Sequence, residues 1–298
     1  MSLRSDTRDQ LMRLVYALGW RTADRLPDAL VAQLISRGAR LAQTRNGLHV
    51  RQLRRNLELA TNWPVTDDLV QRAVASYLRN LTEVLALPSW SAAEIKGRVR
   101  TVNGSVLKRA FAGPGAVVAL PHSGNWDLAG AWAVHSGMPV TTVAERLADA
   151  DFDAFVRFRR QLGIEVLSDH DPQVIVELIA AVRRRRLVCL VADRDLLGTG
   201  LPVTWAGHPV TMPAGPALVA RRTGARLIPA VCQFADRSMI ITFGDPVPAE
   251  PGRAGLTAMT QTVADFFAQT IARRPADWHM MQPFFAPPAE AAARERSR

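Results

Sequence analysis

A strand-to-helix corner at Ala119–Asp127 constrains this chain more than any other stretch of its sequence. The corner follows an apolar run, Ala116–Leu120, with the composition of a buried strand, and it leads into a helical segment, Leu128–His135. Pro121 and Gly124 lie between the two, as is typical of a loop. In α/β proteins, reactive groups commonly lie at such corners, beyond the carboxyl end of a strand. We therefore expect an α/β fold with functional residues at this corner.

Two residues of the corner, His122 and Asp127, have side chains suited to acid–base chemistry. They are five positions apart, so on one helix they would point about 140° away from each other. Their side chains can converge only if His122 lies on the loop and Asp127 lies in the first turn of the helix. In that turn the helix dipole favours a carboxylate, which can either orient an imidazole or cap the helix.

From Gly104 onward, apolar runs alternate with helical segments. The predicted strands are Val117–Pro121, Val140–Glu145, Ile164–Leu167, Leu187–Asp193, Val203–Trp205, Leu227–Gln233 and Met239–Phe243. The predicted helices are Trp126–His135, Phe152–Gln161, Pro172–Arg185 and Pro216–Thr223. This alternation predicts an open, mostly parallel sheet with helices on both faces. The last two strands are close in sequence and are expected to form an antiparallel hairpin at an edge.

The first hundred residues have helical periodicity and many arginines. In the segment Asp28–Arg40 and just after it, apolar residues lie on one side of the predicted helix: Leu30, Val31, Leu34, Ile35 and Leu41. We expect this region to pack on the core, and its arginine-rich face with Trp20 to meet a membrane surface. The chain is thus divided into a helical region at 1–103, an α/β core at 104–286 and a frayed tail at 287–298.

The charge balance limits the class of partner. The chain has 37 basic and 27 acidic residues, a net charge of +10, which indicates an anionic partner. No nucleic-acid-binding motif accompanies the charge, so anionic lipid or a phosphorylated ligand is favoured. No apolar run reaches the roughly 18–20 residues that span a bilayer, and no signal-peptide pattern is present. We expect a protein on the cytoplasmic face of the cell membrane, bound peripherally.

The two cysteines, Cys189 and Cys232, both lie in apolar runs that resemble strands. They are predicted to be buried thiols in a reduced compartment, and neither a disulfide framework nor a metal cluster is indicated.

Four later stretches complete a pattern with the His122 corner. They are Glu145-Arg146, then Asp193-Arg194-Asp195 followed by Val203–Gly207, then Thr211–Ala217, and finally Pro275 with Trp278 and Gln282–Phe284. Together these stretches, over residues 117–285, resemble the branch of the glycerolipid-type acyltransferase superfamily that includes the lipid A biosynthesis acyltransferases and the actinobacterial phosphatidylinositol mannoside acyltransferases. Trp205 stands where that pattern more usually has Phe. The joint occurrence in the correct order is far more specific than any single match.

The resemblance implies a one-step acyl transfer in which His122 acts as general base. Glu145 or Asp127 is expected to orient the imidazole, and the spacing does not decide between them. Arg194 and backbone amides near Gly215 are candidate donors to the oxyanion. Further contacts with the acyl donor or the acceptor are expected from the remaining motif residues: Ser123, Asn125, Trp126, Arg146, Asp193 and Asp195.

The implied substrates are acyl-CoA and an anionic glycolipid, a mannose of phosphatidylinositol mannoside, and no cofactor or metal is expected. The acyl chain needs an apolar groove, for which the small residues of the helix after His122, among them Ala129 and Ala133, leave room.

Two alternatives of a different class remain open from the sequence. Asp193 and Asp195 form an Asp-x-Asp pattern after a strand, as in metal-dependent nucleotide-sugar glycosyltransferases, although Arg194 between them would repel a divalent cation. The basic helices would also suit a non-catalytic protein that binds anionic membranes. The aromatic stretch around Trp278 is expected to be core.

Overall fold

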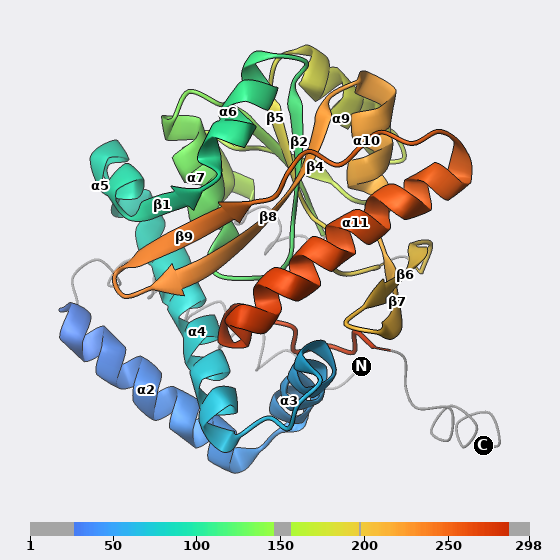
Figure 1. Ribbon diagram of the computed structural model, residues 1–298. Helices are drawn as coiled ribbons and strands as arrows, with labels where there is room; N and C mark the ends of the chain where they lie inside the picture. The colour runs from blue at the N-terminus through green and yellow to red at the C-terminus, as the bar shows by residue number, and fades with distance from the viewer. Residues whose placement is uncertain (1–26, 146–155, 197, 286–298) are drawn as a thin grey trace, which may run out of the picture.

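The computed structural model describes residues 27–145, 156–196 and 198–285, and it has a central sheet of seven strands (Figure 1). The strand order is β1-β9-β8-β2-β5-β3-β4. The strands are β1 (Val99–Val102), β2 (Ala116–Leu120), β3 (Val140–Ala144), β4 (Glu165–Ser168), β5 (Leu187–Val191), β8 (Arg226–Ala235) and β9 (Ser238–Phe243). Strands β8, β2, β5, β3 and β4 run parallel, and β9 returns antiparallel to β8. The predicted α/β fold is confirmed.

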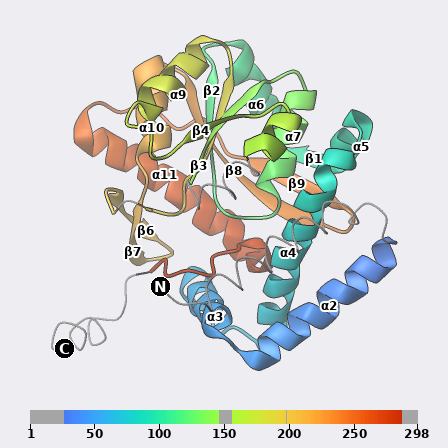
Figure 2. The ribbon, with the colours of Figure 1, turned by 180° about the vertical axis from the view of Figure 1, so that it is seen from behind.

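Strand β2 shows why the run before His122 is apolar throughout. All five of its residues are buried, and they alternate between two hydrophobic cores: Val117 and Ala119 face one, Val118 and Leu120 the other. Helices α6 (Gly104–Ala112) and α7 (Trp126–His135) cover one face of the sheet. Helices α9 (Val174–Arg183), α10 (Gly215–Thr223) and α11 (Gly252–Arg273) cover the other face (Figures 1 and 2).

The edges of the sheet differ from the sequence prediction. The β8–β9 hairpin forms, but β1 pairs with β9 and takes the edge position. Strand β1 lies within the region that was predicted to be helical. Only its first residue, Val99, is buried, so it lacks the apolar alternation that identifies a strand in a sequence.

Strand β6 (Leu201–Trp205) also departs from expectation, because it leaves the main sheet. It pairs with β7 (His208–Met212), a strand that the sequence did not predict, in a separate antiparallel hairpin. The hairpin turns through Ala206 and Gly207, both at positive φ. Helix α11 packs against β6 and was likewise not predicted.

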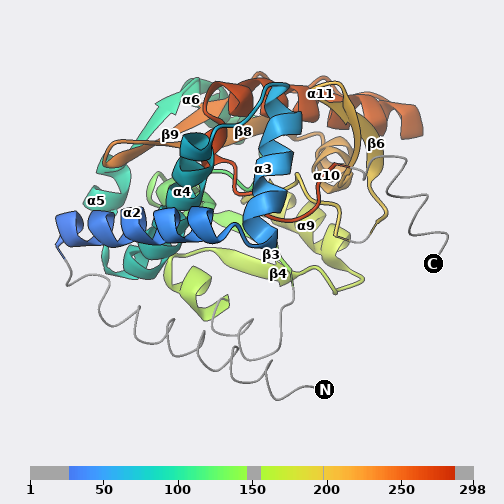
Figure 3. The same ribbon diagram turned by 90° about the horizontal axis from the view of Figure 1, so that it is seen from below.

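The N-terminal helices gather at the end of the sheet where β2 and β5 terminate (Figures 1 and 3). They are α2 (Asp28–Arg45), α3 (Leu48–Thr61) and α4 (Asp67–Ala86), whereas the short α5 (Ala92–Gly97) lies beside β1 and contacts α7 (Figure 1). Helix α4 begins at Thr66, whose hydroxyl accepts from the backbone N–H of Leu69. Among the described residues, none of the helices combines the length and apolar content needed to span a bilayer.

Two of these helices hold the C-terminal segment of the described chain. Asn56 of α3 donates to the backbone oxygens of Met280 and Gln282 at 2.8 and 2.7 Å. Ser76 of α4 donates to the Asp277 carboxylate at 2.7 Å. The N-terminal helices therefore position residues 277–282, which in turn contact the His122 loop. Trp20, the first residues of the predicted helix Phe152–Gln161 and the tail 287–298 lie outside the described residues.

Candidate active site

Hydrogen bonds of its own side chains stabilise the conformation of the loop after β2. Ser123 Oγ donates to the backbone oxygen of Cys232 at 2.7 Å, and Asn125 accepts from the backbone N–H of Leu128 as the N-cap of α7. Gly124 has φ +59°, and a Cβ there would lie 2.7 Å from the Cys232 oxygen, so only glycine fits. Ser123 and Asn125 are buried, and their expected contact with substrate remains a prediction.

His122 pairs with Asp193, which follows strand β5. Nδ1 of His122 lies 2.6 Å from Oδ1 of Asp193, and the backbone N–H of His122 donates to Oδ2 at 2.9 Å. The carboxylate is fully buried, whereas the imidazole retains 27% of its exposure. With Nδ1–H donated to the carboxylate, Nε2 is the ring nitrogen left to accept a proton. The pair thus has the geometry of a general base with an orienting carboxylate.

The ionisation state of Asp193 suits this role. Burial alone would raise its pKa, but the charge of His122 and hydrogen bonds from His122 and Trp278 outweigh that effect and lower the pKa. Trp278 Nε1 donates to Oδ2 at 3.0 Å. Asp193 is therefore an anion at neutral pH. The sequence pattern marked Trp278 as core, and nothing in the spacing indicated its contact with Asp193.

Neither carboxylate that the sequence offered as the partner of His122 makes this contact. Asp127, in the first turn of α7, accepts from Arg159 Nε at 2.6 Å, and both side chains are buried. Glu145 is 44% exposed and lies 3.8 Å from Arg194. Strand β5 separates the strand of Glu145 from β2, so two interstrand spacings, about 9–10 Å, lie between them.

Arg194 follows Asp193 directly in the chain. Its guanidinium donates to Gln282 Oε1 and faces Glu145. Gly215 lies at the start of α10, beside Leu190 of β5, and its predicted role as an amide donor remains a prediction. Arg146 lies outside the described residues.

The Asp-x-Asp pattern does not form a metal-binding pair of carboxylates. Asp193 is bound to His122 and Trp278, while Asp195 accepts from the backbone N–H groups of Thr199 and Gly200 at 3.2 and 2.9 Å. Within the described part of the chain, no group of three or more His, Cys, Asp and Glu side chains is arranged to hold a metal ion. Asp193 therefore binds the imidazole of His122.

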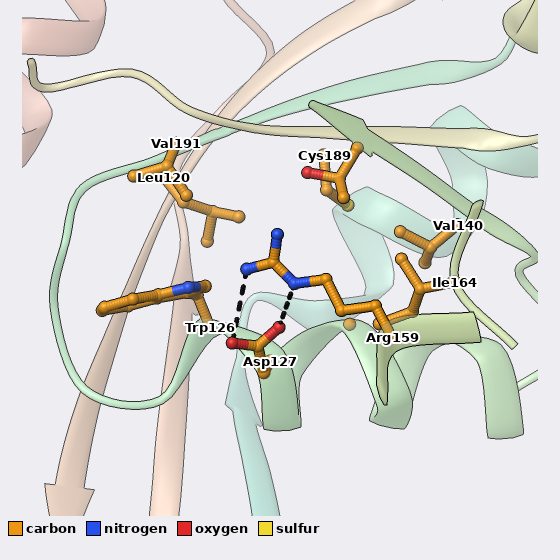
Figure 4. A pocket seen from close by; sticks show the side chains of 10 residues that line it. Leu120, Trp126, Asp127, Val140, Arg159, Ile164, Cys189 and Val191 are labelled. Carbon is orange, nitrogen blue, oxygen red and sulfur yellow. Dashed lines mark hydrogen bonds and ion pairs between the residues drawn. The ribbon is translucent and has the colours of Figure 1, made fainter. Parts of the chain in front are cut away.

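A small pocket, with a cavity volume of about 20 Å³, lies between α7 and the strands β2, β3 and β5 (Figure 4). The Trp126 ring forms one wall and meets the His122 ring edge-on, with centroids 5.3 Å apart. The guanidinium of Arg159, paired with Asp127, points into the pocket. The remaining lining residues are mostly apolar: Leu120, Gly130, Val140, Thr142, Ile164, Cys189 and Val191. Ala129 and Ala133, which were expected to flank a groove, do not line this pocket and are buried in the core.

Gly130 explains why α7 can approach the pocket so closely. A Cβ at this position would lie 2.8 Å from Cδ1 of Ile164, so a larger residue would displace that side chain. Of the small residues of α7 that were expected to leave room for a groove, Gly130 lines the pocket.

Comparison with known proteins shows the family of this chain. Residues 4–286 match the family model described as bacterial lipid A biosynthesis acyltransferase. A phosphatidylinositol mannoside acyltransferase of Mycolicibacterium smegmatis is 40% identical over 284 residues, which is 92% of this chain and 91% of the relative. One of Mycobacterium tuberculosis is 40% identical over 298 residues, covering 95% of this chain and 92% of the relative. The chain therefore belongs to the bacterial lipid A biosynthesis acyltransferase family and is an acyltransferase.

Proposed function

We propose that this protein transfers a long fatty acyl chain from acyl-CoA to a hydroxyl of a glycolipid, a mannose of phosphatidylinositol mannoside, with His122 as general base. The observation that carries the proposal is the 2.6 Å contact between His122 Nδ1 and Asp193 Oδ1, which leaves Nε2 free to accept a proton. The acceptor follows the name that the relatives bear.

The reaction needs no covalent enzyme intermediate. The acceptor oxygen attacks the thioester carbonyl while Nε2 of His122 takes its proton, and a tetrahedral oxyanion forms. The C–S bond then breaks, and the imidazolium returns the proton to the leaving thiolate. Asp193 stabilises the imidazolium between these two steps. The Ser123 side chain is buried, and its hydroxyl donates a hydrogen bond to the backbone oxygen of Cys232, so it is not available as a nucleophile.

Arg194 is the side chain best suited to stabilise negative charge during the reaction. It follows Asp193 directly, and its side chain retains 24% of its exposure. Its contacts with Gln282 and Glu145 hold the guanidinium in place before substrate binds. A preorganised cation of this kind suits either the thioester oxyanion or a phosphate of the donor.

The pocket beside Trp126 is the site that we assign to the first carbons of the acyl chain. Its wall residue Trp126 contacts the His122 ring, and most of its lining residues are apolar. Each CH₂ group moved from water into such a lining contributes roughly 0.8 kcal/mol, so an alkyl chain gains more affinity there than a polar group would.

Helix α2 supplies the surface that we assign to the membrane. Leu30, Leu34 and Leu41 are 42%, 52% and 51% exposed, and with Arg37 they follow helical spacing along one stripe. The adjoining face packs on α4 through Ala39 and Ala42. A stripe of leucine and arginine suits the boundary between acyl chains and anionic headgroups. Helices α3 and α4, which follow α2 in the chain, hold residues 277–282, and these contact the His122 loop.

The proposal is tested by incubating the full chain with palmitoyl-CoA and purified phosphatidylinositol mannoside. His122→Ala should lower turnover by about 10²–10⁴-fold with little change in thermal stability. His135→Ala, at the exposed end of α7, is the control and should retain activity. Wild-type turnover in folded His122→Ala would refute the mechanism.

Two parallel reactions test the substrates. One replaces CoA with acyl carrier protein as the thiol of the donor, and the other replaces the acceptor with a lipid A precursor. Preference for either replacement would overturn that part of the proposal. A further reaction with EDTA should proceed at the same rate, and loss of activity on chelation would contradict metal-free transfer.

A further inference from the structure

The indole of Trp278 contacts Asp193, the carboxylate that pairs with His122. Trp278 is fully buried, as a core residue would be. Its Nε1 nevertheless donates to Oδ2 of Asp193, the same oxygen that accepts from the backbone N–H of His122. The other oxygen, Oδ1, is left for Nδ1 of His122. The carboxylate is thus held by donors on both oxygens, and the indole supplies one of them.

The indole itself is held on several sides. Its ring stacks on Trp205 with centroids 5.3 Å apart and planes 16° apart, and Phe284 meets it edge-on at 5.1 Å. The backbone on either side of Trp278 is bonded to the His122 loop. Gly124 N–H donates to the Asp277 oxygen at 2.9 Å, and His279 N–H donates to the His122 oxygen at 2.8 Å. The indole N–H therefore has a fixed position relative to both members of the pair.

We infer that Trp278 is a positioning residue, whose N–H holds the Asp193 carboxylate in the plane that aligns Oδ1 with Nδ1 of His122. This inference rests on the proposed function of His122 as general base. Without the N–H, Oδ2 would keep only the backbone donor. The carboxylate could then rotate away from the imidazole, and a smaller fraction of His122 would present an unprotonated Nε2.

The other titratable and charged groups considered around the pair are either neutral or bound to other partners. His279 is the neighbouring titratable ring, and burial lowers its pKa to about 3, so it is neutral at neutral pH. Arg194 is directed toward Gln282 and Glu145. Asp127 is paired with Arg159. The donors that the structure describes on Asp193 are those of His122 and Trp278.

Trp205 provides a matched control. It is fully buried in the same aromatic stack, but its indole N–H has no hydrogen-bond partner among the described residues. Trp278→Phe and Trp205→Phe therefore remove the same atoms from adjacent rings, and only the first removes a donor from Asp193. We expect Trp278→Phe to lower kcat about 10-fold or more with little change in KM, and Trp205→Phe to stay within about 3-fold of wild type.

A double-mutant cycle separates positioning from packing. In the Asp193→Asn background, Trp278→Phe should cause no further loss of kcat, because its effect acts through Asp193. A loss that multiplies with that of Asp193→Asn would overturn the inference. Should Trp278→Phe fail to fold, the tryptophan analogue in which sulfur replaces the indole N–H, placed at position 278 alone, keeps the ring volume and allows the same cycle.

A readout without turnover keeps this test distinct from that of the proposed function. NMR of ¹⁵N-labelled histidines, with the His122 signals assigned from His122→Gln, reports which ring nitrogen of His122 carries the proton. Trp278→Phe should lower the fraction of the Nδ1–H tautomer, since a carboxylate that has lost a donor is held less firmly against Nδ1. Trp205→Phe should leave it unchanged. An unchanged fraction in Trp278→Phe would refute the positioning role even if His122→Ala were inactive.

Discussion

His122 and Asp193 each stand two residues beyond the paired positions Leu120 and Val191 of the adjacent parallel strands β2 and β5. The register of this one strand pair brings together two side chains that are 71 positions apart in the sequence. The contact is therefore a direct consequence of strand order and register.

Asp193→Asn should lower kcat about 10²–10⁴-fold, because an amide cannot stabilise the imidazolium and its N–H can select the wrong tautomer. Asp127→Asn and Glu145→Gln should lose much less activity per folded molecule, since neither carboxylate contacts His122. Steady-state kinetics on the three purified variants checks the order. A larger loss in Asp127→Asn or Glu145→Gln than in Asp193→Asn would contradict the assignment.

The buried Asp127–Arg159 ion pair should matter for stability. Asp127→Asn replaces the buried carboxylate that accepts from the Arg159 guanidinium, which should lower the free energy of unfolding by about 1.5–3 kcal/mol in urea denaturation. The exposed pair Asp68–Arg72 is the control, and Asp68→Asn should change stability by no more than about 1 kcal/mol. Similar effects at the two sites would mean that the buried charge is better solvated than the structure indicates.

Burial lowers the pKa of His279 to about 3, which predicts a loss of stability in mild acid. In the unfolded chain this histidine titrates near 6.5, so below that pH the unfolded state binds a proton that the folded state does not. The stabilisation is complete above pH 6.5 and is lost as the pH falls toward 3, by an amount on the order of a few kcal/mol. Burial raises the pKa of Asp277, so this residue has the opposite effect: just above pH 3.8 its contribution to stability increases as the pH falls.

Urea denaturation at pH 7 and pH 5 isolates the part due to His279. His279→Asn should lose less stability between the two pH values than the wild type does. His135→Asn is the control: it removes a histidine from an exposed position, where we expect little effect on the pH dependence of stability. Equal losses in wild type and His279→Asn would show that another group causes the acid sensitivity.

The stripe on α2 predicts how membrane binding should respond to substitution. Leu34→Asp with Leu41→Asp should weaken binding to vesicles that contain phosphatidylinositol, in a sedimentation assay, because exposed apolar area is lost and negative charge is added. Raising the salt concentration should weaken wild-type binding as well. Val176→Asp is the control, since Val176 is 57% exposed on α9, at the far end of the molecule (Figure 1). If Val176→Asp weakened vesicle binding equally, α2 would not be the membrane-binding surface.

The pocket predicts a change in acyl-chain preference. Thr142 lines it and is only partly buried, so Thr142→Phe should fill space and shift the preferred donor to shorter chains while short-chain transfer persists. Ala133→Phe fills core space away from the pocket and should destabilise the protein and depress all donors alike. Rates with thioesters of 4 to 18 carbons would distinguish the two. An unchanged optimum in folded Thr142→Phe would place the chain elsewhere.

Local patterns of the sequence were sufficient for the elements that carry the site. The apolar run before His122 became β2, and the predicted helix Trp126–His135 matches α7, because Asn125 caps it and its composition is strongly helical and apolar. The order of motifs was also sufficient to identify the acyltransferase family. Strand β1 was missed because three of its four residues are exposed and carry no apolar pattern.

The partner of His122 was decided only by the tertiary structure. The sequence offered Asp127, which is near in the chain, and Glu145, which ends a strand as Asp193 nearly does. Which strand lies beside β2 depends on long-range packing of the whole sheet, and no local periodicity encodes it. Once β5 occupied that place, Asp193 met the imidazole, Asp127 turned toward Arg159, and Trp278 came from the other end of the chain to hold the carboxylate.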